Sequence, residues 1–188
     1  VEGDRVTALE LFFDLVFVYA FTQVTTVLAA RPDALGISRG LLILAVLWWC
    51  WSGYAWLGNT VRADEGVVRL VLFGVMGVMF VVAQTIPEAF DDFPGGLSGP
   101  VVFVGGYLVV RLSHLMVYWW AAYDDPGLRR RLLVFAGPMV AGVAVLLVAT
   151  FTDGWLQVSL WALALAIDYG ETIVMSAEGW RVYSAVHF

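Results

Sequence analysis

The sequence contains no lysine, one cysteine and two histidines, and only 14% of its 188 residues are charged. A soluble domain is usually about 25% charged, so the shortage of charge argues against one. Without a lysine, the chain cannot bind retinal as a Schiff base. The single cysteine, Cys50, excludes an intramolecular disulfide, and its place in an apolar block predicts a thiol that packs as a small apolar group.

The scarcity of ligand residues excludes several kinds of site. Bis-histidine haem needs two facing histidines, whereas only His114 falls inside an apolar block and His187 lies at the end of the sequence. A structural zinc site needs four good ligands, which one cysteine and two histidines do not readily supply. Ser113 directly precedes His114, and neighbouring side chains on a helix point about 100° apart, so no Ser-His-Asp triad is expected there. We therefore expect no metal, no cofactor and no enzymatic activity.

Apolar residues are abundant, at 61% of the chain, and the mean hydropathy is +0.85. They form blocks of about 20 residues, the length that an α-helix needs to cross a ~30 Å hydrocarbon layer. Backbone amides must be paired within lipid, so these blocks are predicted to be helices. We expect an all-α polytopic transmembrane helix bundle with about six spans, at residues 8–30, 40–61, 67–87, 100–122, 132–151 and 155–175.

Short connections with turn residues separate the blocks, among them RPDALGIS at 31–38 and DDPGLRRR at 124–131. Such short connections predict antiparallel neighbours in a single helical membrane domain over residues 1–188. The first block is too long for a signal peptide and is expected to stay as a span. Because the sequence starts at Val1 without a methionine and stops at AVHF, we expect it to be the N-terminal part of a longer chain.

All ten basic residues are arginine, and they are distributed unevenly between the two predicted membrane faces. By the positive-inside rule, the richer face is cytoplasmic, so both termini are predicted to face the cytoplasm. The net charge of −6 adds little to this rule, and no nucleic-acid partner is suggested. The richer face has Arg5, Arg62, Arg69, Arg129, Arg130, Arg131 and Arg181; the other has Arg31 and Arg39, and Arg111 lies within a span.

The stretch ELFFDLVFVYAF at 10–21 places two acids, Glu10 and Asp14, at the start of the first block. Residues four apart lie on one helix face, so Asp14 is roughly 6 Å deeper than Glu10. An acid at a helix start is favoured by the helix dipole, which explains Glu10 as an interfacial residue. An acid within a span usually faces the bundle interior, so we expect Asp14 to have a buried partner.

The fourth block carries a polar stripe, because Tyr107, Arg111, His114 and Tyr118 recur at intervals of four, three and four. His114 is closest in depth to Asp14, which makes the fourth helix the expected source of its partner. Asp168, near the inner end of the sixth block, is expected to join. The predicted buried polar cluster comprises Glu10, Asp14, Arg111, His114 and Asp168, and the secondary polar stripe comprises Tyr107 and Tyr118.

Two functions stay open for these residues. Intramembrane ionisable groups often mark a pathway for a proton or a small solute, which predicts a transporter. Opposite charges can also hold helices in register without any transport. The second alternative is a structural or regulatory membrane protein whose partner is the lipid bilayer.

The opening ELFFDLVFVYAFTQ at 10–23 resembles the signature of the bacterial low temperature requirement protein A family. The tryptophan-rich LWWCWSGYAW at 47–56 and the passages at 62–90 and 107–131 agree in order, so the resemblance covers essentially the whole chain. It implies a bacterial inner-membrane protein from a family whose members are about twice this length. The family is named for growth in the cold and not for a known reaction. The matching residues are Glu10, Asp14, Arg111 and His114, and no catalytic role comes with them.

Overall fold

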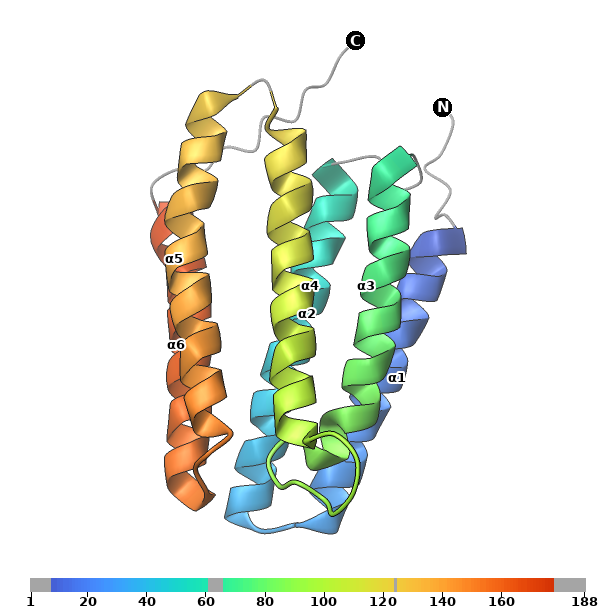
Figure 1. Ribbon diagram of the computed structural model, residues 1–188, viewed down its shortest axis with the longest axis vertical. Helices are drawn as coiled ribbons and strands as arrows, with labels where there is room; N and C mark the ends of the chain where they lie inside the picture. The colour runs from blue at the N-terminus through green and yellow to red at the C-terminus, as the bar shows by residue number, and fades with distance from the viewer. Residues whose placement is uncertain (1–7, 61–65, 124, 178–188) are drawn as a thin grey trace.

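The computed structural model describes residues 8–60, 66–123 and 125–177, and this part of the chain is all-helical (Figure 1). The prediction of an all-α fold is therefore confirmed, whereas a single domain over residues 1–188 stays a prediction. Arg5, Arg62, Arg181 and His187 lie outside the described residues. The elements are α1 (Ala8–Ala30), α2 (Ala34–Thr60), α3 (Gly66–Thr85), the short 3₁₀ helix η1 (Ile86–Glu88), α4 (Gly99–Ala121), α5 (Pro126–Ala149) and α6 (Gly154–Ala177).

Five of the helices in the described ranges are long and apolar enough to cross a membrane, by length and composition. The sixth predicted span corresponds to α6, which also carries the polar residues Gln157 and Asp168. Both of these side chains are nevertheless buried within the bundle. The five segments are Leu11–Ala30, Ala34–Leu57, Gly66–Glu88, Gly99–Ala121 and Arg129–Ala149.

The six helices form a closed ring in the order α1, α3, α4, α5, α6 and α2, and α2 also contacts α4 across the ring. Helices that follow each other in the chain run in opposite directions (Figure 1), as the short connections predict. The ring order differs from the chain order, because α3 packs against α1 and α6 packs against α2. This order decides which polar side chains can meet.

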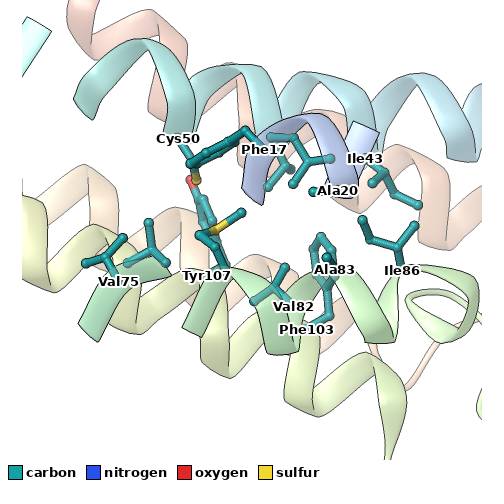
Figure 2. Close-up of a cluster of buried hydrophobic side chains, with 14 of the residues drawn as sticks. Phe17, Ala20, Ile43, Cys50, Val75, Val82, Ala83, Ile86, Phe103 and Tyr107 are labelled. Carbon is teal, nitrogen blue, oxygen red and sulfur yellow. The ribbon is translucent and has the colours of Figure 1, made fainter. Parts of the chain in front are cut away.

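The bundle buries aromatic and aliphatic side chains in its centre and exposes others around its outside. Phe17, Ile43 and Phe103 come from three helices and are at most 1% exposed, and Figure 2 shows this part of the core. Large apolar side chains on the outer surface include Leu15 at 60% and Leu70 at 71%. An exterior this apolar is typical of a protein that faces lipid rather than water.

Two helices begin earlier than the apolar blocks predict. The second block was expected from residue 40, but α2 begins at Ala34, where the Asp33 carboxylate accepts a hydrogen bond from the Gly36 amide at 2.8 Å. This is an N-cap, which satisfies an amide that the first helical turn leaves unpaired. Similarly, α5 begins at Pro126 instead of residue 132, because proline suits the first turn of a helix. As a result, Arg39 lies within α2 instead of in a connection.

The third helix ends just before Pro87. The predicted span reached residue 87, but α3 ends at Thr85 and continues as the 3₁₀ helix η1 around Pro87. Proline has no amide hydrogen to extend the α-helix. The chain then crosses to α4, whose first amide, from Gly99, donates to the Asp92 carboxylate at 3.0 Å.

Adjacent glycines on α4 provide a test of how closely α3 and α4 pack. A Cβ at Gly106 would overlap Val82 Cγ2, whereas a Cβ at Gly105 would meet no atom within 4 Å. Val82 is buried and β-branched, so its side chain cannot turn away freely. We expect Gly106→Ala to lower the free energy of unfolding by about 1–3 kcal/mol. The matched control Gly105→Ala should leave it unchanged or raise it by up to about 1 kcal/mol. Unfolding in detergent micelles measures both, and equal effects would contradict the packing described.

Candidate functional site

Asp168 on α6 is the most deeply buried acid among the described residues, with 2% of its surface exposed. Tyr107 on α4 donates its hydroxyl hydrogen to Asp168 Oδ2. One turn further along α4, Arg111 places Nη2 3.7 Å from Asp168 Oδ1, which makes an ion pair without a hydrogen bond. Trp49 on α2 lies beneath the arginine, with the Arg111 Cζ 5.3 Å from its ring centroid. We call Trp49, Tyr107, Arg111 and Asp168 the Asp168 cluster.

Local geometry explains why these residues meet. Tyr107 and Arg111 are four residues apart on α4, so both point from the same face. On the opposite side, Gly142 brings the backbone of α5 against α6, because a Cβ there would lie 3.5 Å from Asp168 Oδ1 and 3.3 Å from the carbonyl oxygen of Ala164. Figure 2 shows Tyr107 crossing from α4 toward Cys50 on α2. The carboxylate is therefore enclosed by α2, α4 and α5.

An aromatic pair closes the cluster from the remaining side. The Trp49 and Tyr169 rings have centroids 4.4 Å apart, and Tyr169 donates its hydroxyl hydrogen to the carbonyl oxygen of Ala45 at 2.9 Å. This bond ties α6 to α2. A shallow apolar hollow of about 500 Å³ lies outside this pair, between α1, α2 and α6. Its apolar lining suits lipid chains better than a polar solute.

Three polar atoms of the Asp168 cluster are buried without a hydrogen-bond partner among the described residues: Asp168 Oδ1, Arg111 Nε and Trp49 Nε1. Such atoms are uncommon in folded proteins, and each costs about 1–3 kcal/mol. One acceptor and two donors that remain available at one place form a site that can accept a proton, a water molecule or a small polar solute. The described residues contain no group of three or more metal-ligating side chains.

His114, which the sequence predicts in the cluster, makes a different contact. Its Nε2 lies 3.0 Å from the carbonyl oxygen of Gly53 on α2, and since a carbonyl only accepts, Nε2 donates. The His114 ring packs edge-on against Tyr118 with centroids 5.0 Å apart. Close by, Tyr54 donates its hydroxyl hydrogen to the carbonyl oxygen of Val110 at 2.9 Å. These contacts join α2 to α4, so His114 serves helix packing in this structure.

The structure does not bring Asp14 into the Asp168 cluster. Asp14 is exposed on α1 and accepts a hydrogen bond from Trp51 Nε1 at 2.9 Å. Its partner is thus on α2 and not on the fourth helix, which corrects the expectation of a buried partner there. The reason is the ring order, since α1 packs mainly against α2 and α3. Glu10 lies on α1, but its side chain is outside the described residues.

A second buried polar group, which the sequence analysis missed, lies at the end of the bundle where α3 connects to α4. Arg39 is 4% exposed; its Nη1 donates to Asp91 Oδ2 at 2.6 Å and its Nη2 to Gln157 Oε1 at 2.8 Å. We call Arg39, Asp91 and Gln157 the Arg39 clasp. The sequence did contain a sign of this group. Gln157 and Asp168 are eleven residues apart on α6, so they share one helix face, and a buried Asp168 predicts that Gln157 is buried as well.

Comparison with known proteins gives one family. Residues 5–188 match the family described as Bacterial low temperature requirement A protein (LtrA). An uncharacterized protein of Rhizobium meliloti (strain 1021) is 30% identical over 167 residues, which cover 87% of this chain and 39% of that protein. The chain thus spans well under half of that relative's length. No solved structure matches.

The ion pair between Arg111 and Asp168 can be tested through its energetic coupling. Removing one member of a buried pair leaves the other charge uncompensated, which typically costs about 3–5 kcal/mol. We expect Asp168→Leu and Arg111→Leu each to lower the free energy of unfolding by this amount, and the double variant to lower it by clearly less than the sum. Unfolding in micelles measures all four proteins. Additive losses would mean that the two side chains do not interact.

Proposed function

This chain belongs to the bacterial low temperature requirement A (LtrA) protein family, and from that premise we propose that it is a multi-pass protein of the bacterial inner membrane that moves protons or a small solute. The observation that carries the proposal is Asp168 Oδ1, a buried carboxylate oxygen that has no hydrogen-bond donor in the described part of the chain and an arginine 3.7 Å away. No catalytic reaction is part of this proposal.

Depth supports a role in transport. Asp168 lies fourteen residues into α6 and Arg111 twelve residues into α4, which correspond to about 21 Å and about 18 Å along their helices. In a hydrocarbon layer of ~30 Å, both residues are near the middle. Ionisable groups at that depth are costly to bury and characteristically belong to ion or substrate pathways.

The cluster has the chemistry that proton coupling requires. Tyr107 donates to one carboxylate oxygen, Oδ2, so the other oxygen, Oδ1, is left to take up a proton or to accept a hydrogen bond from a solute. Arg111 stabilises the ionised carboxylate by charge. Protonation of Asp168 would cancel this attraction and release Arg111 from α6, while its contact with the Trp49 ring on α2 would stay. Protonation of Asp168 would thereby weaken the link between α4 and α6.

The alternative is a structural or regulatory membrane protein that supports growth in the cold, and one observation favours it. Tyr54, His114 and Tyr169 each bond to a backbone carbonyl of a neighbouring helix. Bonds of this kind fix the positions of α2, α4 and α6 and need no transported solute. The two alternatives differ in whether Asp168 must ionise.

Replacing Asp168 by Asn tests the transport proposal, because the amide keeps the shape of the side chain and removes its proton chemistry. We expect proton flux in liposomes containing the full-length protein to fall about tenfold or more, which corresponds to about 1.4 kcal/mol. Asp14→Asn is the matched control and should keep its flux, since Asp14 is exposed and outside the cluster. Flux is read with an enclosed pH-sensitive dye, and thermal unfolding confirms that each variant is folded.

Two results would reject the transport proposal. In the first, the wild-type protein carries no flux under any imposed proton or solute gradient, which would leave the structural alternative. In the second, a folded Asp168→Asn variant transports as well as the wild type. If Asp168→Asn does not fold, Tyr107→Phe removes only the hydroxyl donor and should reduce flux less severely.

The predicted orientation, with both termini in the cytoplasm, is testable at two exposed aromatic or apolar positions. Leu97 in the connection before α4 is 82% exposed, and Tyr123 after α4 is 73% exposed. Arg129, Arg130 and Arg131 lie just beyond Tyr123, whereas Arg31 and Arg39 lie on the Leu97 side, so the arginine count places Tyr123 in the cytoplasm. In intact cells, an impermeant thiol reagent should therefore label Leu97→Cys and not Tyr123→Cys. Labelling of Tyr123→Cys and not of Leu97→Cys would show that the orientation is opposite to the predicted one.

A further inference from the structure

We propose that the connection between α3 and α4, at residues 86–98, closes one end of the bundle above the Asp168 cluster. In this closure the Phe90 ring blocks access to the interior of the bundle and is called the plug. Arg39 is the positioning residue that holds Phe90 in place. The meaning of this closure for transport rests on the proposed function. The closure itself can be tested without knowing any transported solute.

Arg39 holds two successive residues of the connection. Its guanidinium makes the 2.6 Å ion pair with Asp91, and its Cζ lies 5.0 Å from the centroid of the Phe90 ring. A buried arginine is costly unless its charge is paired, so these contacts favour the closed position of the connection. The Asp91 side chain is 57% exposed, which means that this hold can be broken from the aqueous side.

Gln157 on α6 fixes the position of the connection through a second set of hydrogen bonds. Its amide nitrogen donates to the carbonyl oxygen of Phe90 at 3.0 Å, while its amide oxygen accepts from Arg39. The same nitrogen lies 3.4 Å from the carbonyl oxygen of Ala149, at the end of α5. The connection is therefore fastened to α2 and α6, neither of which is adjacent to it in the chain.

Phe90 begins a line of aromatic rings that leads toward the Asp168 cluster. The ring is 6% exposed and lies 4.4 Å, between centroids, from Trp161, which is completely buried. Trp161 in turn lies 5.4 Å from Phe103 on α4. Trp161 precedes Asp168 by seven residues on α6, so the two share a face and are about 10 Å apart along the axis. Phe90 and Trp161 therefore lie between this end of the bundle and Asp168 along α6.

The rest of the connection is built to move without unfolding a helix. Residues 91–97 are exposed, and Gly95 and Gly96 have φ values of 101° and 93°, which other residues rarely adopt. Asp92 stays bound to the first amide of α4. The buried part consists of Ile86, Ala89 and Phe90, and releasing Phe90 requires breaking the Arg39 clasp and separating the Phe90 ring from Trp161.

Cys50 offers a reporter for access, because it is the only cysteine of this sequence and lies beside the cluster. It is 4% exposed, follows Trp49 directly, and faces Tyr107 (Figure 2). The full-length protein is treated with a small cationic methanethiosulfonate, in intact cells and in inside-out vesicles. Labelling of the peptide that contains Cys50 is then timed by mass spectrometry. In the wild type, we expect slow labelling from both sides.

Three variants open the closure at different points. Asp91→Asn weakens the ion pair, Arg39→Leu removes the clasp, and Phe90→Ala removes the plug while leaving the Arg39–Asp91 pair intact. Because hydrogen bonds to charged groups are among the stronger ones, we expect labelling to become about tenfold faster or more, only from the side of the connection. Arg31→Leu is the matched control, since the Arg31 side chain is exposed and its ion pair with Asp33 is long, at 3.9 Å, so this variant should not change the rate.

The proposal is overturned if folded Asp91→Asn and Phe90→Ala proteins label at the wild-type rate. It is also overturned if labelling rises equally from both sides, since that result would indicate general loosening of the bundle. Thermal unfolding identifies variants that fail to fold, and Asp91→Asn and Phe90→Ala carry the test if Arg39→Leu is among them. A one-sided increase in labelling, together with an absence of proton or solute flux, would support the closure and reject the proposed function.

Discussion

The pairing of buried charge in an apolar bundle is the constraint on which the rest of this structure depends. The helices present apolar side chains to the outside, and the charged groups near the middle of their length, Arg111 and Asp168, turn inward and find partners there. Arg111 and Asp168 satisfy this requirement across α4 and α6, and Arg39 and Asp91 satisfy it across α2 and the connection before α4. The first pair joins helices that are not adjacent in the ring, because α5 lies between α4 and α6 in the ring order.

The helices were predictable because a membrane imposes a length on an apolar segment. Every apolar block of about 20 residues became a helix, and the bounds of α1 were predicted correctly. The starts of α2 and α5 were not, because their first turns are stabilised by an N-cap at Asp33 and a proline at residue 126 and not by hydrophobicity. Caps lie outside the apolar block and must be sought separately.

The candidate site was predictable in part. Helical periodicity identified the face of α4 that carries Tyr107 and Arg111, and the presence of an acid within α6 identified Asp168. The partner of Asp14 was not predictable, because periodicity gives the face of a helix and not the order of helices around the ring. Arg39 was missed for another reason. A charge at the border of an apolar block is usually solvated, and only the fold shows that this one is covered by a connection.

The two buried polar groups differ in how completely their hydrogen bonds are met, and this difference separates their roles. In the Arg39 clasp, both terminal nitrogens of the arginine and both ends of the glutamine amide are bonded, and Arg39 Nε alone lacks a partner. A group satisfied to this degree favours one conformation, here the closed position of the connection. In the Asp168 cluster, an acceptor and two donors are unmet on three side chains. Leaving them unmet destabilises the fold, and a protein that needed only a link between α4 and α6 would gain stability from apolar residues there. The unmet atoms therefore support the proposed function, in which a proton or a small solute binds among them.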